Sequence, residues 1–192
     1  VSSFRSRQRF DLSDRQHQPS LFPPLNATSW DDRLNLDGTV SYSGRDEGDG
    51  FRSYTQFFHN GIVEGVQTEI VAETEDRGKL LLAGHYEYGL TYRPASMTRY
   101  MKGLRELGVE PPIWCFISLV GVKGARIPTS GYFSDERRDI DRDVLLLPET
   151  IIDDLDRDAL DVLRPSFDLV WNASGYSGTS NFDAEGKWIG KD

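Results

Sequence analysis

Apolar side chains occupy both alternating sets of positions in residues 113–120, which makes this segment the strongest candidate for the core of the fold. The run reads Ile-Trp-Cys-Phe-Ile-Ser-Leu-Val and stops at Gly121. Strict alternation would indicate a strand with one solvated face, whereas an apolar run on both parities is typical of a strand covered on both faces. We therefore predict a central strand here, with Cys115 as a small buried apolar group.

A helix is predicted before this strand, beginning at Pro94, whose fixed φ and missing N–H suit the first helical turn. Its apolar positions recur at helical spacing and are Met97, Tyr100, Met101, Leu104 and Leu107. Gly108 supplies a left-handed cap, and Pro111-Pro112 prevents continuation. The apolar face of this helix should pack on the sheet.

Earlier in the chain, polar and apolar residues alternate as they do in antiparallel sheets. One strand is predicted over 34–42, and a hairpin is predicted over 51–58 and 62–72. Asn60-Gly61 joins the two arms of the hairpin, and both residues tolerate the positive φ that a tight turn requires. A further short strand is predicted over 79–84.

A helical pattern returns near the C-terminus. Asp156 is the predicted N-cap. The apolar stripe that follows consists of Leu160, Leu163, Phe167, Val170 and Trp171. Pro165 should break or kink this helix, because it lacks an N–H donor and its ring clashes with the preceding turn. We expect two short helices that end near Gly175, followed by a loosely held tail.

These elements predict an α+β fold, with an antiparallel or mixed sheet flanked by the amphipathic helix and the C-terminal helices. The chain has 192 residues, which suits a single domain with an extended N-terminal arm. The predicted organisation is an arm or interdomain linker over 1–29, an α+β accessory domain over 30–175 and a C-terminal tail over 176–192. The arm is assigned because its charged, proline-punctuated sequence has no sustained apolar periodicity.

The charge balance is acidic. The sequence has 22 Lys and Arg against 31 Asp and Glu, a net charge of -9. This argues against the chain holding duplex nucleic acid by itself, because phosphate neutralisation needs clustered Lys and Arg. A single cysteine excludes an internal disulfide framework. No apolar run approaches the roughly 20 residues that span a bilayer, and no secretory signal opens the sequence, so we expect a cytoplasmic protein.

His85 and Glu87 are the residues that most invite a catalytic interpretation. On a strand they would face the same side and could form a base with its orienting group, or part of a metal site. A metal site needs three or four converging ligands, and the other two histidines, His17 and His59, lie in the arm and beside a hairpin turn. A packing role is favoured, and no catalytic residue, metal site or cofactor is predicted for this chain.

A set of carboxylates could imitate a nuclease cluster. The set is Glu64, Glu69, Glu73, Glu75 and Asp76. Glu64 would point away from Glu69 on a regular strand, and no lysine completes an acid-acid-lysine arrangement, so solvated hairpin charges are the favoured interpretation. A metal-dependent nuclease that uses scattered carboxylates and His85 is the enzyme alternative.

Lys123 and Arg126 follow the exit of the predicted central strand, where loop residues often carry function. The Gly-Val-Lys-Gly turn of 121–124 lacks the longer spacing with which a P-loop wraps phosphates. We predict that Lys123 and Arg126 contact an anionic ligand or an acidic partner surface.

Six ordered motifs carry a resemblance to a known family. They are the segments 30–38 (WDDRLNLDG), 56–64 (QFFHNGIVE), 107–112 (LGVEPP), 119–124 (LVGVKG), 140–149 (IDRDVLLLPE) and 163–172 (LRPSFDLVWN). Together they resemble the region that follows the Schlafen-AlbA-type domain in bacterial proteins described as DNA-binding or ATP-binding, from about Trp30 to Trp188. The motifs identify this accessory region and no active site.

The resemblance implies a non-catalytic regulatory or interaction domain, sensor-like in its layers, of a cytoplasmic prokaryotic protein. Its partners would be the preceding Schlafen-AlbA-type domain, a further copy of the chain in a homo-oligomer, or another protein. Nucleic acid and ATP would be bound only through the preceding domain, which would lie before Val1.

We predict that the isolated chain binds duplex DNA no better than an unrelated acidic protein and does not hydrolyse ATP, because its charge opposes phosphate contacts and it has no nucleotide-binding loop. The measurement is DNA binding and ATP turnover at low salt, where electrostatic binding is strongest, with the longer protein assayed beside the chain. Salt-sensitive DNA binding, nucleic-acid cleavage or ATP turnover by the chain alone would favour the enzyme alternative.

Overall fold

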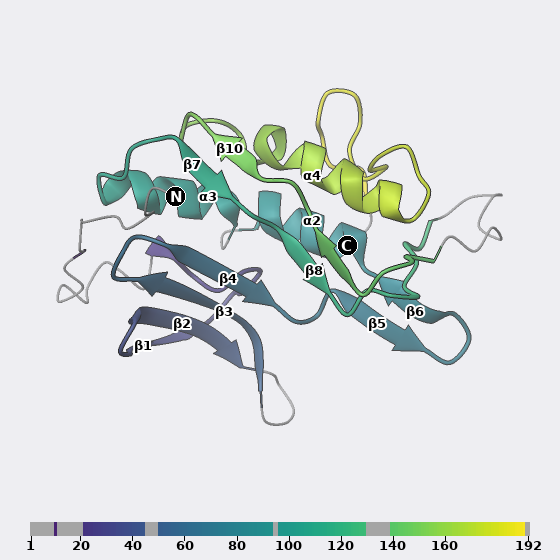
Figure 1. Ribbon diagram of the computed structural model, residues 1–192, viewed down its shortest axis with the longest axis horizontal. Coiled ribbons are helices and arrows are strands. Elements are labelled where there is room, and N and C mark those ends of the chain that lie inside the picture. Colours follow the sequence, from purple (N-terminus) through teal and green to yellow (C-terminus); the bar gives the residue numbers. More distant parts are fainter. Residues whose placement is uncertain (1–9, 11–20, 45–49, 94–95, 130–138, 191–192) are drawn as a thin grey trace, which may run out of the picture. The chain divides into compact units, whose positions relative to one another are not determined.

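A computed structural model describes residues 10, 21–44, 50–93, 96–129 and 139–190 (Figure 1). Helices and antiparallel strands are both present, so the predicted α+β class is confirmed. The chain divides into two compact units. Unit 1 takes its described residues from Val1–Thr68 and Tyr92–Glu110, and unit 2 from Glu69–Thr91 and Pro111–Asp192. The boundaries between the units fall inside the segment 30–175 that the sequence assigns to one domain.

The core of unit 1 is a four-stranded antiparallel sheet in the order β1-β2-β3-β4. Its strands are β1 (Asp31–Leu34), β2 (Gly38–Gly44), β3 (Phe51–Phe58) and β4 (Val63–Gln67). The hairpin predicted at Asn60-Gly61 is confirmed. Gly61 has φ 86°, and the Asn60 side chain accepts a hydrogen bond from the Ile62 N–H at 3.2 Å. The turn chemistry of the sequence therefore sets the register of β3 and β4.

The strand predicted over 34–42 is instead two strands joined by a tight turn. Asn35 causes the turn, because its Oδ1 accepts hydrogen bonds from the N–H groups of Asp37 at 3.0 Å and Gly38 at 2.8 Å. Asn is favoured in turns for this ability to bond its own backbone two or three residues on. The alternating pattern of apolar residues continues through the turn and conceals it.

Helix α3 (Met97–Glu106) packs on this sheet. The Tyr100 hydroxyl bonds the hydroxyl of Thr55 on β3, which ties the buried face of the helix to the sheet. The chain leaves the helix through Gly108 at φ 72°, as the sequence predicts. Pro94, the predicted first residue of the helix, lies outside the described residues.

The described end of the predicted arm also belongs to the core of unit 1. Leu21, Phe22 and Ala27 are buried, and the ring of Phe22 stacks on that of Phe57 with centroids 4.7 Å apart. Residues 21–27 are therefore packed in the core of unit 1, which corrects the expectation of a linker for this part of the chain. The rest of the arm, apart from residue 10, lies outside the described residues.

Unit 2 is built around α4 (Ala159–Ala173), one continuous helix. Asp158, rather than Asp156, is its N-cap and accepts a hydrogen bond from the Leu160 N–H at 2.7 Å. Pro165 lies inside the helix without ending it, which corrects the prediction of two short helices. The stripe that α4 buries includes Leu163, Phe167, Val170 and Trp171. This burial outweighs the hydrogen bond that the proline removes.

Among the described residues of unit 2, the other elements are one helix and six short strands. They are α2 (Ala83–Thr91), β5 (Val71–Thr74), β6 (Gly78–Leu81), β7 (Ile113–Cys115), β8 (Ser118–Val120), β9 (Val144–Leu146) and β10 (Thr150–Ile152). β5 pairs with β6, β7 with β10, and β8 with β9, all antiparallel. Residues 113–120 and 144–152 therefore form one long two-stranded structure, which we call the ribbon (Figure 1).

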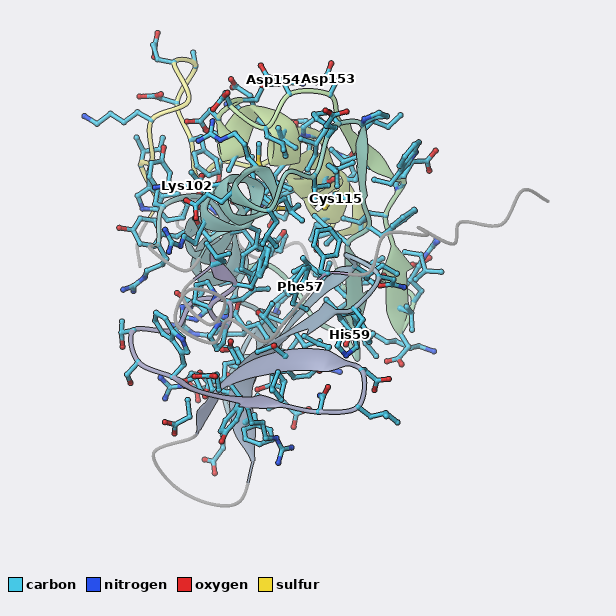
Figure 2. All side chains as sticks on the ribbon, turned by 90° about the vertical axis from the view of Figure 1, so that its left-hand side faces the viewer. Phe57, His59, Lys102, Cys115, Asp153 and Asp154 are labelled. Atoms are coloured by element: carbon cyan, nitrogen blue, oxygen red, sulfur yellow. The ribbon has the colours of Figure 1, made fainter. Side chains whose placement is uncertain are left out.

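Cys115 lies on the face of the ribbon that packs on α4. It pairs with Thr150, whose hydroxyl lies 3.1 Å from that of Ser166 on the helix, and Figure 2 labels the residue. Burial raises the pKa of the Cys115 thiol from 9.0 to about 11. A raised pKa means little thiolate at neutral pH, so this cysteine behaves as the packing group that the sequence predicts.

We expect Cys115 to react with a disulfide reagent at pH 8 about a hundredfold more slowly in the folded chain than in the unfolded chain, because the thiolate is the reactive form. The measurement is the rate of reagent release with and without denaturant. The chain has one cysteine, so Cys115→Ala supplies the background rate. Equal rates in the two states would contradict a buried thiol.

Candidate functional site

The ribbon exposes a row of large apolar side chains on one of its two faces. They are Trp114, Phe116, Val120, Val144, Leu146 and Ile151, and we call them the open face. Phe116, Val120 and Leu146 are 71%, 67% and 77% exposed. Scattered apolar residues are ordinary on a protein surface, whereas a contiguous group of them marks an interaction surface. The open face is therefore the candidate functional site.

A β-bulge brings these residues to the same side of the ribbon. Across the two strands of the ribbon, Trp114 pairs with Ile151, Ser118 with Leu146, and Val120 with Val144. Directly paired residues share a face. Between the first two pairs one strand advances from 114 to 118, four residues, while the other advances from 146 to 151, five residues. The extra residue reverses the alternation on the second strand and keeps its apolar residues on the open face.

The opposite face of the ribbon is covered. Leu119, Leu145 and Ile152 are 3%, 6% and 2% exposed, and β10 packs against α4. The strand predicted over 113–120 therefore has one covered face and one open face. The prediction that both faces of this strand are covered is wrong for the open face.

One end of the ribbon leads into the turn that holds Lys123 and Arg126. Lys123 is exposed, and its carbonyl accepts a hydrogen bond from Lys79 Nζ on β6 at 3.3 Å. Arg126 is half-buried, because its guanidinium donates to the carbonyl of Arg77 and its backbone N–H donates to that of Lys79 at 3.1 Å. The two predicted binding residues thus share one turn. Arg126 supports that turn, whereas Lys123 presents its charge to solvent.

Acidic side chains gather at the other end of the ribbon, after β10. Figure 2 shows Asp153 and Asp154 in the turn that leads to α4, and both are exposed. Asp153 accepts from Arg157 at 3.2 Å, an exposed pair that contributes less than about 1 kcal/mol to stability. Asp154 accepts from the N–H of Asp156 at 2.9 Å. The open face therefore lies between a turn with an exposed lysine and a turn with two exposed aspartates.

Glu87 on α2 is fully buried and forms a polar tie within unit 2. Its carboxylate accepts hydrogen bonds from Trp171 Nε1 at 2.7 Å, Asn181 Nδ2 at 2.8 Å and Thr179 Oγ1 at 2.9 Å. Burial raises the pKa of Glu87 above its ordinary value of 4.5, while the three donors act in the opposite direction. Because both oxygens have fixed partners and no exposed surface, Glu87 joins α2, α4 and the C-terminal segment and offers nothing to a substrate.

The pairing of His85 with Glu87 on one face of a strand is not formed. Both residues lie on α2, because the strand predicted over 79–84 ends at Leu81 and the helix begins at Ala83. Side chains two residues apart on a helix point in different directions. His85 and Glu87 therefore do not have the geometry of a base and its orienting group.

The carboxylates considered as a nuclease cluster lie on separate elements. Glu64 is on β4 of unit 1 and accepts a hydrogen bond from the Tyr54 hydroxyl at 2.8 Å. Glu73 is on β5 of unit 2, and Glu75 and Asp76 lie in the turn that follows that strand. Across the residues that the structure describes, no three His, Cys, Asp and Glu side chains form a group that could hold a metal ion.

The segment after α4 is packed, which corrects the expectation of a loosely held tail. Phe182 is 4% exposed and meets the ring of Phe167 at 6.3 Å and that of Trp188 at 5.2 Å. Trp188 in turn lies 5.1 Å from the ring of Tyr88 on α2. These contacts, together with the hydrogen bonds to Glu87, fix the C-terminal segment to both helices.

No family model, curated protein or solved structure matches this chain. In the described part of the chain, no helix is long and apolar enough to cross a membrane. The interpretation of the site therefore rests on its own geometry.

Sequence reasoning identified the residues of the open face as core and so missed them as a surface. The available signal was the apolar set at even positions from 114 to 120. An apolar pattern indicates that these side chains are buried in the functional protein, but it does not indicate which surface buries them.

We expect Glu87→Ala to destabilise unit 2 by about 3 kcal/mol or more, because the buried indole N–H of Trp171 and two half-buried donors lose their acceptor. The measurement is denaturant unfolding, combined with limited proteolysis of the segment after α4. Thr179→Val removes one of the three hydrogen bonds and is the matched control, with an expected cost of about 1 kcal/mol. A Glu87→Ala chain as stable as the wild type would contradict this assignment.

The pH dependence in the same experiment has a defined sign. Because burial raises the pKa of Glu87 above 4.5, the folded state holds this proton more tightly than the unfolded state. The stability that protonated Glu87 contributes is therefore complete below about pH 4.5 and is lost as the pH rises through the folded pKa. Glu87→Gln does not titrate at this position, so the stability of the wild type relative to this variant should fall with rising pH. A pH-independent difference would contradict the raised pKa.

Proposed function

We propose that this chain is a non-catalytic interaction domain that docks onto a protein surface through the open face. The observation that carries the proposal is the mismatch between the sequence of 113–120 and its exposure. The segment is apolar on both parities, but only the side chains directed toward α4 are covered. Such a sequence is typical of a strand with cover on both sides. A partner that buries Trp114, Phe116 and Leu146 supplies the missing cover.

The open face also has the composition of a protein interface. It includes two aromatic residues, and charged side chains border it, with the exposed Glu149 inside the ribbon and Lys123, Asp153 and Asp154 at its ends. Protein interfaces combine an apolar, aromatic centre with a polar rim in the same way. Lys123 would belong to this rim, where it would meet an acidic partner surface.

We further propose that the domain regulates a neighbouring domain of a cytoplasmic prokaryotic protein. The support is the resemblance of six ordered motifs to the region that follows Schlafen-AlbA-type domains. Two of these motifs, 119–124 and 140–149, contribute strands and turns of the ribbon. Nucleic acid or ATP would be bound by the neighbouring domain, and this domain would respond through its interactions.

We expect Phe116 and Leu146 to be protected from hydroxyl radicals when the protein is isolated from cells with its partners attached. Their oxidation should be severalfold slower there than in the purified, diluted chain, because a partner excludes solvent from the open face. Leu36 is 92% exposed in a turn of unit 1 and is the control that should label equally in both samples. Equal labelling of Phe116 and Leu146 in the two samples would contradict an interaction function of the open face.

A further inference from the structure

We propose that the partner of the open face is a protein surface that holds an arginine among apolar side chains, and that this arginine pairs with Glu149. The proposal rests on the proposed function, because it names the chemistry of the partner that binds the same surface. The observation behind it is an exposed carboxylate inside a largely apolar face. A partner that covers this face must also accommodate that charge.

Glu149 lies on the same face of the ribbon as Ile151. Thr150, between them, faces α4, where its hydroxyl lies 3.1 Å from that of Ser166. Successive side chains of a strand point to opposite faces, so both neighbours of Thr150 are directed away from α4. Glu149 is exposed, as Ile151 is. Position 149 also lies near the middle of the ribbon strand 144–152, so a partner that covers the open face reaches this carboxylate.

The β-bulge of the ribbon brings Glu149 beside Phe116. Counted from the Cys115–Thr150 pair, the next residue on one strand is Phe116 and the next residue on the other is Glu149. Residues opposed across an antiparallel pair have Cβ atoms about 5 Å apart. The carboxylate is therefore a neighbour of an exposed aromatic ring. Bulges commonly re-aim side chains at functional sites, and this bulge adds a charge to an apolar surface.

The carboxylate of Glu149 has no partner in the part of the chain that the structure describes. Neither a hydrogen bond nor an ion pair joins it to another described residue. Covering an ionised carboxylate without a new partner removes its water and gives nothing in return, which is one of the largest costs of burying a surface. A partner that binds the open face must therefore bring a counter-charge to this position.

Arginine fits this position better than lysine. Its planar guanidinium can donate two parallel hydrogen bonds to a carboxylate and can also lie on an aromatic ring. Glu149 offers the carboxylate, and Phe116 and Trp114 offer exposed rings on the same face. Arginine is also among the residues that contribute most to the stability of protein interfaces. The surface around it would be apolar, because it has to cover Leu146 and Ile151 as well.

The charges at the ends of the ribbon give the partner an orientation. The turn after β10 has one exposed cation, Arg157, among exposed aspartates, which are Asp153, Asp154, Asp156 and Asp158. The turns at the other end carry exposed charges of both signs, which are Lys123, Asp139, Asp141, Arg142 and Asp143. Further basic side chains of the partner would therefore lie toward the aspartate end, where their potential is complementary.

A second copy of the chain and a lipid surface both fit this carboxylate less well. A two-fold contact centred on the open face would bring Glu149 of each copy toward its counterpart, where like charges repel. A bilayer would bring the carboxylate to its apolar layer, and anionic headgroups would repel Asp153 and Asp154. A protein surface with an arginine supplies the counter-charge without either repulsion.

The first experiment changes the charge of Glu149 in cells that contain the protein and its partners. In Glu149→Lys, hydroxyl radicals should oxidise Phe116 and Leu146 of the isolated assembly as fast as in the purified, diluted chain, because a lysine would repel the partner's arginine. Glu149→Gln keeps the size of the side chain without its charge and should give an intermediate rate.

Glu185→Lys changes an exposed glutamate of the C-terminal segment and is the matched control, so it should leave the protection of Phe116 and Leu146 intact. Full protection of these two residues in Glu149→Lys overturns the proposal.

The second experiment identifies the residue that lies over Glu149. A photoreactive benzoylphenylalanine in place of Ile151 cross-links the neighbouring surface in cells, and mass spectrometry locates the cross-linked peptide. We expect an arginine flanked by apolar residues in it. Changing that arginine to glutamate should weaken binding at least about tenfold, and combining this change with Glu149→Arg should restore most of the affinity. A cross-linked surface without a cation, or no recovery in the exchanged pair, overturns the proposal.

Failure of this proposal can be distinguished from failure of the proposed function. If Phe116 and Leu146 are protected in the assembly but the charge of Glu149 has no effect, the open face binds a protein of other chemistry. Cross-links to the open face of a second copy would identify a symmetric contact. Binding of the purified chain to vesicles of equal parts phosphatidylcholine and phosphatidylglycerol, lost in Phe116→Ser, would identify a lipid surface. Each of these results overturns the arginine partner, whereas equal oxidation of the wild type with and without its partners contradicts both proposals.

Discussion

Unit 2 depends on the burial of α4. Leu163, Phe167 and Val170 are inaccessible to solvent, so the helix is in contact with neighbours along its whole apolar stripe. The ring of Phe167 meets that of Tyr86 on α2 at 5.7 Å, and β10 of the ribbon packs on the same helix. A proline inside a helix costs about 3 kcal/mol. Several large side chains at about 1.5–3 kcal/mol each exceed that cost, which explains why Pro165 does not end the helix.

Apolar packing holds these elements together but does not fix their register, and Glu87 supplies that constraint. Its three hydrogen bonds come from α4 and from the C-terminal segment, and each has a defined direction. A partly satisfied carboxylate in this position would be costly, so the arrangement tolerates little displacement. The C-terminal segment is therefore structural, although its Gly, Ser and Asn content resembles that of a loose tail.

The parts of the fold that local chemistry decides were predictable from the sequence, and the parts that tertiary packing decides were not. The hairpin at Asn60-Gly61 and the helix end at Gly108 follow from backbone preferences of those residues. Helix α2 was not predicted, and its first two residues were assigned to the strand over 79–84. Gly89 and two tyrosines give this segment little helical propensity, and packing on α4 overrides that preference. The open face could not be predicted from the sequence, because the apolar pattern of 113–120 indicates burial but does not show which surface buries these residues.

The position of the open face within unit 2 links it to the polar tie. At one end, Lys79 and Arg126 connect the ribbon turn to β6, and β6 leads directly into α2 and Glu87. At the other end, Asp153 and Asp154 open the turn that leads to Asp158, the N-cap of α4, and that helix carries Trp171, the closest hydrogen-bond donor to Glu87. A protein that covers the open face contacts both of these routes at once. Because α2 and α4 meet at one buried carboxylate, both ends of the ribbon lead along the chain to the same three hydrogen bonds. Under the proposed interaction function, this connection would be the route by which a bound partner exerts control.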